Sequence, residues 1–144
     1  MQSGEINFTA DKIAALIPHG KGMSMISEIV SWDANTIHCR SNRLAEASNP
    51  LCENGELSSI VLVEYAAQAA AIHGALLNSA LGEQRPAYIG AVKNIELFMQ
   101  QANNRESIDI HADCLMNNGA GAIYEVAIQQ QTMLLRGKLI LSQP

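Results

Sequence analysis

The segment 60–77, IVLVEYAAQAAAIHGALL, constrains the fold of this chain most, because it is almost entirely apolar and yet carries Glu64 near its start. Burying an unpaired carboxylate is costly, so such a group is expected to be paired, protonated or engaged in chemistry. Apolar residues fall on most faces of the helix that this segment predicts. We therefore expect a central, wrapped helix over about 58–79, capped by Ser58 or Ser59.

The same segment has 18 residues, which would suffice for a short membrane span. A span would place Glu64, Gln68 and His73 in lipid, and no Lys or Arg anchors flank the segment. The N-terminus lacks the basic start of a signal peptide, and Asp11 and Lys12 interrupt its short apolar run. We therefore expect a cytoplasmic protein that does not associate with a membrane.

Strand patterns lie on both sides of the predicted helix. Before it, β-rich runs over 23–32 and 36–43 flank Asp33-Ala34-Asn35, which predicts a hairpin. After it come four candidate strands, at 87–98, 107–116, 122–130 and 132–141. A short helix over about 10–16 is expected to precede them all. One long helix with an antiparallel sheet curling around it is an α+β solution.

Composition bounds the class of protein. The chain has 144 residues, 48% of them hydrophobic and 16% charged, which favours one globular domain spanning 1–144. A net charge of −5 argues against nucleic acid as a partner. Cys39, Cys52 and Cys114 form no CxxC pair, so we expect reduced and mostly buried thiols.

The helix carries the candidate chemistry. Glu64 and Gln68 are four residues apart and share a face, with Tyr65 on the neighbouring stripe. His73 lies nine residues after Glu64, which is about two and a half turns, so the two point to opposite sides. We expect His73 to be a core or interface histidine with satisfied hydrogen bonds. For Glu64 two interpretations stand: a buried structural carboxylate, or an acid whose pKa burial raises for proton transfer.

The segments IPHGKGMSMISEIVSWD and NPLCENGELSSIVLVEYAAQAAAIHGAL resemble the 3-hydroxyacyl-acyl-carrier-protein dehydratases, and most closely the small bacterial branch linked to aryl polyene lipid synthesis. Pro18-His19 matches the Pro-His segment of that family. Glu64, Tyr65 and Gln68 match the acid, the aromatic or small residue, and the Gln of its central helix. The resemblance implies the hotdog fold, and neither a cofactor nor a metal.

The resemblance also implies a mechanism. A loop histidine removes the proton next to the thioester carbonyl, and the helix acid protonates the departing 3-hydroxyl group. In this branch the histidine precedes a proline, 15 positions ahead of the acid, where this chain has Asn49 before Pro50. An amide is not a general base at neutral pH, but it can hold a water or orient a carbonyl. We therefore assign Glu64, Asn49 and Gln68 to the catalytic site.

Substrate contacts are expected from four positions, which are Pro50, Gly55, Tyr65 and His19. His19 is also the best substitute base in the sequence, although the family has a structural histidine there. Cys52 is a weaker alternative, a nucleophile only if its pKa were lowered, and nearby acidic residues oppose that. A semi-buried loop thiol is the plainer interpretation.

Two further groups of residues have ordinary explanations. Asp109, His111 and Asp113 project from one face of one strand at a spacing of about 6–7 Å, which is wide for one metal ion, so we expect a solvated face. Four cationic residues are scattered along the chain and could form a patch for an acidic carrier protein, although dispersed surface charge is the ordinary explanation. They are Arg40, Arg43, Lys93 and Arg105.

Three functions remain open. The chain could be a dehydratase-like enzyme with Glu64 as acid and an unidentified base. It could be a hotdog thioesterase, with Glu64 activating water or attacking the thioester, and Asn49 positioning the carbonyl or the water. It could also be a catalytically silent subunit that completes the site of an active dehydratase. In each case we expect an acyl carrier protein or coenzyme A thioester as ligand, and a homodimer or higher oligomer joined edge to edge.

Overall fold

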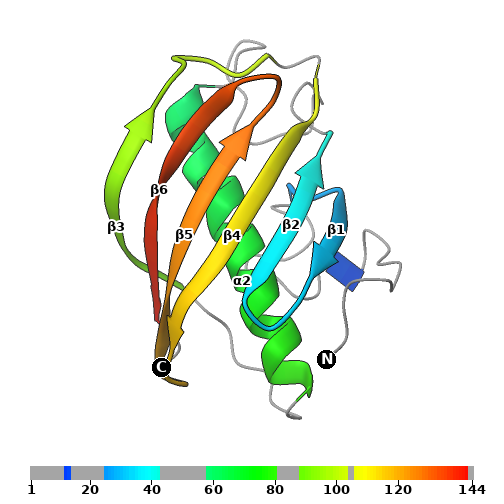
Figure 1. Cartoon of the computed structure of the whole chain (residues 1–144), viewed down its shortest axis with the longest axis vertical. Helices are drawn as coiled ribbons and strands as arrows, with labels where there is room; N and C mark the ends of the chain where they lie inside the picture. The colour runs from blue at the N-terminus through cyan, green and yellow to red at the C-terminus, as the bar shows by residue number, and fades with distance from the viewer. Residues whose placement is uncertain (1–11, 14–24, 43–57, 81–87, 104–105, 143–144) are drawn as a thin grey trace.

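The structure is a computed structural model. It describes residues 12–13, 25–42, 58–80, 88–103 and 106–142. Within these ranges the 3₁₀ turn η2 (Ser59–Val61) leads into one long helix, α2 (Leu62–Ala80). Six strands accompany the helix (Figure 1): β1 (Glu28–Trp32), β2 (Thr36–Ser41), β3 (Tyr88–Leu97), β4 (Ile108–Asn117), β5 (Gly121–Gln129) and β6 (Met133–Ser142).

The strands form a single antiparallel sheet in the order β1-β2-β4-β5-β6-β3. The helix α2 lies across one face of the sheet, as Figure 1 shows, and packs against β2, β4, β5 and β6. The expected α+β architecture, a sheet curling around one helix, is therefore confirmed. β3 is an edge strand that pairs with β6 and extends beyond the cover that α2 provides.

Turn chemistry explains the hairpins. At the β1–β2 turn, the Asp33 carboxylate accepts hydrogen bonds from the backbone N–H groups of Asn35 (2.8 Å) and Thr36 (3.0 Å). At the β4–β5 turn, Gly119 has a φ of 86°, which favours glycine. The β1–β2 turn lies where the sequence predicts a hairpin, and β2 and β5 alternate buried residues with more exposed ones, as half-buried strands should.

The core is aliphatic and centres on the helix. Every residue from Tyr65 to Gly74 is buried, which confirms the expectation of a wrapped helix. Inward-facing residues of β5, such as Val126 and Ile128, pack against it. At the start of the helix, Ser58 accepts a hydrogen bond from the Ile60 N–H through its hydroxyl (3.4 Å), as a capping serine should.

The predicted short helix over about 10–16 falls mostly outside the described residues, although Lys12 and Ile13 are helical. Cys39 is buried, which raises the pKa of its thiol to about 12, and Cys114 is partly buried. Both are free thiols, as expected, and Cys52 lies outside the described residues. No described helix is long and apolar enough to cross a membrane.

Candidate active site

Glu64 lies in the first turn of α2 and is half-buried. The carboxyl group is therefore less buried than the sequence predicts. The α-helix begins at Leu62 rather than near residue 58, so Glu64 lies even closer to the start of the helix than predicted. The positive end of the helix dipole stabilises negative charge at this position. This placement gives the carboxyl group both partial shielding from water and an accessible side.

Gln68 connects Glu64 to the segment that precedes β1. Its side chain is buried, and its Oε1 accepts a hydrogen bond of 2.8 Å from the backbone N–H of Met25. Because a backbone N–H can only donate, this bond fixes which end of the amide is oxygen. The Gln68 Nε2 therefore points to Glu64 and donates to its Oε1 across 3.4 Å, which is a long hydrogen bond. The result is a chain of contacts that orients the carboxyl group.

Tyr65 is fully buried in the core, one position round the helix from Glu64. Tyr65 is predicted to contact substrate, and its side chain belongs to the core in this structure. The contact with substrate stays a prediction. The other predicted site residues belong to segments 14–24 and 43–57, which lie outside the described residues. They are His19, Asn49, Pro50 and Gly55.

His73 occupies the opposite side of α2 and makes two hydrogen bonds. Its Nε2 donates to the Asp33 carbonyl at 2.7 Å, so Nδ1 is left to accept from the Tyr124 hydroxyl at 2.5 Å. Burial lowers the pKa of His73 and raises that of Tyr124, which keeps both groups neutral. The expected core histidine with satisfied hydrogen bonds is confirmed, and it is not part of an acid–base pair with Glu64.

Asp109, His111 and Asp113 lie on the outer face of β4, away from α2. Asp109 accepts hydrogen bonds from His38 (2.8 Å) and from Arg40 (3.1 Å). Burial alone would raise the pKa of Asp109, but these two donors hold it below its usual value. Among the described residues no group of three or more His, Cys, Asp or Glu side chains is arranged to hold a metal ion.

The predicted cationic patch is not supported at Arg40, whose charge is engaged by Glu28 and Asp109. Lys93 is exposed on β3, and Arg43 and Arg105 lie outside the described residues. Two partners in the site and core were not anticipated, the Met25 N–H and the Tyr124 hydroxyl. They lie 43 and 51 residues from Gln68 and His73, so no local pattern could have revealed them.

The chemistry available at the described site is that of one oriented carboxyl group. It can exchange a proton with a ligand, activate a water molecule, or attack an electrophilic carbon. The remaining candidates belong to the segments 14–24 and 43–57, outside the described residues. A second polar group, from one of those segments or from another subunit, is needed for two-step proton transfer.

Comparison with known proteins reduces the number of reactions to consider for this carboxyl group. The model of the ApeP-like family, described as ApeP dehydratase, matches residues 11–144. No curated protein matches the chain in sequence. The structure resembles the ApeI:P dehydratase heterocomplex of Xenorhabdus doucetiae with a TM-score of 0.84, at 18% identity and covering 92% of this chain and 90% of that chain.

Thioesterases are also similar in fold. A thioesterase from Haemophilus influenzae matches with a TM-score of 0.65 at 15% identity, covering 96% of this chain and 92% of that chain. A hypothetical thioesterase from Streptococcus pneumoniae, solved with coenzyme A, matches with a TM-score of 0.59 at 12% identity, covering 81% and 84%. These likenesses confirm the hotdog fold.

Proposed function

The chain belongs to the ApeP-like family of dehydratases, and from that premise we propose that it works on 3-hydroxyacyl thioesters as the subunit that supplies the acid Glu64. The observation that carries the proposal is the fixed orientation of the Glu64 carboxyl group. Gln68 holds it from one side, and the Met25 N–H holds Gln68. A group that delivers a proton to one leaving oxygen has to be held in this way.

In the proposed reaction, a base removes a proton from the carbon next to the thioester carbonyl. The electron pair of that C–H bond forms the new carbon–carbon double bond, and the C–O bond of the 3-hydroxyl group breaks. Protonated Glu64 gives its proton to the departing oxygen, so water leaves and the carboxylate remains. The proton held by the base then returns to Glu64 through solvent. The acyl group is carried by an acyl carrier protein or by coenzyme A.

The proposed reaction also needs a general base, which the sequence of this chain does not identify. The resemblance places Asn49 where the branch has its histidine, and Asn49 does not titrate near neutral pH. We infer that Asn49 orients the thioester carbonyl or a water molecule, next to Pro50 and Gly55. The histidine then comes from an active dehydratase partner, and the heterocomplex of the Xenorhabdus doucetiae relative supports such a pairing. The working unit is thus one hotdog domain, 1–144, within an oligomer.

A thioesterase is the second candidate, and the position of Glu64 favours it. A half-buried carboxyl group in the first turn of a helix keeps an accessible side, from which it can activate a water molecule or attack the thioester directly. The two candidates differ in their products, since water loss leaves an unsaturated acyl thioester and hydrolysis releases a free acid.

The proposal is tested by incubating the full-length protein with a 3-hydroxyacyl thioester on each carrier, and by following the acyl group with mass spectrometry. Loss of one water molecule, by the chain alone or together with any active dehydratase that co-purifies with it, supports the dehydratase. Release of free acid instead supports the thioesterase. No change on either carrier, with and without the partner, contradicts both. Asn49→His is expected to create or raise water loss by the chain alone.

A further inference from the structure

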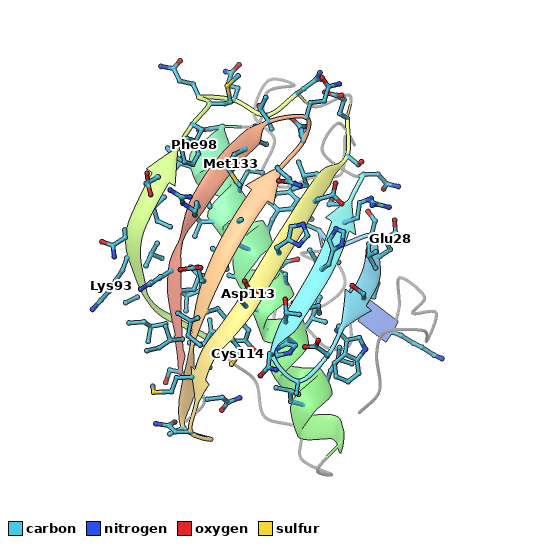
Figure 2. The ribbon with its side chains drawn as sticks, in the orientation of Figure 1. Glu28, Lys93, Phe98, Asp113, Cys114 and Met133 are labelled. Carbon is cyan, nitrogen blue, oxygen red and sulfur yellow. The ribbon has the colours of Figure 1, made fainter. Side chains whose placement is uncertain are left out.

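The face of the sheet that points away from α2 carries two cross-strand rows of opposite character. The register places Asp113 opposite Glu125, Glu125 opposite Lys138, and Lys138 opposite Lys93. These four residues form the charged row, across β4, β5, β6 and β3. Figure 2 views this face and labels the two ends of the row, Asp113 and Lys93, at a similar height on their strands.

The charged row is poorly explained within one copy of the chain. Its two acidic residues are neighbours, and so are its two lysines, and like charges placed directly opposite each other destabilise a sheet. Among the described residues, no salt bridge within 4 Å uses Glu125, Lys138 or Lys93. The order of charge is negative, negative, positive, positive. Such an order is complementary to itself when it is reversed.

The second row is apolar and runs parallel to the first. The register places Met116 opposite Ile123, Ile123 opposite Ile140, and Ile140 opposite Ala91. These four residues form the apolar row. Beside it, Leu115 is extruded by an irregularity in β4, and Leu115 and Met116 are 53% and 48% exposed. Exposed apolar side chains rimmed by charge are typical of an interaction surface.

We propose that a second copy of this chain docks on this face, about a two-fold axis that runs parallel to the strands between β5 and β6. That axis places β4 over the partner's β3, and β5 over the partner's β6. Each acid of the charged row then faces a lysine of the partner: Glu125 faces the partner's Lys138, and Asp113 faces the partner's Lys93. The apolar row faces itself. The same symmetry satisfies both rows, as an isologous interface requires.

The size of the face decides how strong the contact is. Four strands at about 4.8 Å spacing and about 30 Å of strand length give roughly 500 Å² per copy, or on the order of 1,000 Å² buried in total. That lies at the lower limit for a specific interface. The charged row therefore governs the association, because loss of complementarity in a small interface is not offset by a large apolar area. The contact uses the face of the sheet, so it is separate from the edge-to-edge joining expected from the family resemblance.

The test is the mass of the full-length protein in sedimentation velocity, for the wild type and for Glu125→Lys and Lys138→Glu. In either variant alone, residue 125 and the partner's residue 138 carry the same charge. The mass of the assembly is therefore expected to halve. An equimolar mixture of the two variants restores every opposite pair between unlike chains, and wild-type mass is expected to return. Glu28→Lys, the same charge change at an exposed position on β1, is the control and is expected to keep wild-type mass.

Restoration by mixing cannot arise from contacts within one chain, so it distinguishes the interface from a local effect on folding. Far-ultraviolet circular dichroism checks that each variant is folded. For the wild type, the dissociation constant of this contact is expected to rise at least tenfold between low and high salt, which needs no variant. Unchanged mass in both variants, a mixture that stays at half mass, or a salt-independent dissociation constant would overturn the proposal.

Discussion

At the scale of single residues, the candidate site depends on one fixed contact chain. Gln68 accepts from the Met25 N–H and donates to Glu64, and this directionality follows from the fact that the backbone group can only donate. The sequence identified Glu64 and Gln68 as one helix face, because residues four apart are neighbours on a helix. It could not identify Met25, which is 43 residues from Gln68 in the chain.

Replacing Gln68 with Ala is expected to affect both stability and activity. Met25 is fully buried, so its N–H would lose its acceptor, which lowers the free energy of unfolding by about 1–3 kcal/mol. The Glu64 carboxyl group would also lose its orientation, so kcat should fall more than KM rises. Chemical denaturation and steady-state kinetics measure the two effects.

Gln129→Ala, on the outer face of β5, is the matched control and should change the free energy of unfolding by less than about 0.5 kcal/mol. Gln68→Glu preserves an acceptor for Met25 but removes the donor to Glu64. Because it also buries a second carboxyl group beside Glu64, it should lose activity without regaining the stability that Gln68→Ala loses. A Gln68→Ala protein as stable and as active as the wild type would show that the contact chain does not matter.

At the scale of helices and strands, the local sequence pattern predicts most element bounds. The four strands after the helix begin and end within one residue of their predicted bounds, because alternation and turn residues mark both ends of each strand. The start of α2 was less well marked. The 3₁₀ turn Ser59–Val61 precedes Leu62, so the α-helix begins about four residues later than the sequence predicts, and Glu64 in its first turn is half-buried.

His73 connects three elements, since it lies on α2 and bonds Tyr124 of β5 and the carbonyl of Asp33 in the β1–β2 turn. Burial lowers the pKa of His73 from its usual 6.5, so the folded state resists protonation that the unfolded state accepts. The unfolded state then binds more protons below about pH 6.5, and stability is expected to fall as pH falls from 7 to 5, by up to about 1.4 kcal/mol per pH unit for this group.

Urea denaturation at several pH values measures this slope. His73→Gln keeps a hydrogen-bonding side chain without titrating, so its slope should be smaller although its overall stability is lower. Burial also lowers the pKa of His111, which contributes in the same direction. Both proteins, with His73 and with His73→Gln, should therefore carry His111→Asn, so that the difference between their slopes comes from His73. Equal slopes with and without His73 would contradict a neutral, buried imidazole.

At the scale of the whole molecule, the fold class followed from one apolar helix among strands, but the strand order did not. The order β1-β2-β4-β5-β6-β3 places the chain's third strand at the far edge, which is set by tertiary packing rather than by local pattern. The same order brings acidic and basic strands side by side on the outer face. The functional assignment needed the family match, because a lone carboxyl group suits several reactions.

The central claim is that Glu64 supplies the proton that leaves with the 3-hydroxyl group. The most direct test compares wild type with Glu64→Gln, alone and with the co-purifying partner, by the rate of water loss from a 3-hydroxyacyl thioester. We predict at least a hundredfold loss of turnover with an unchanged circular dichroism spectrum, since a general acid contributes about 10²–10⁴-fold. Glu28→Gln, at an exposed position, should keep full activity. Water loss at the wild-type rate by folded Glu64→Gln protein would contradict the account.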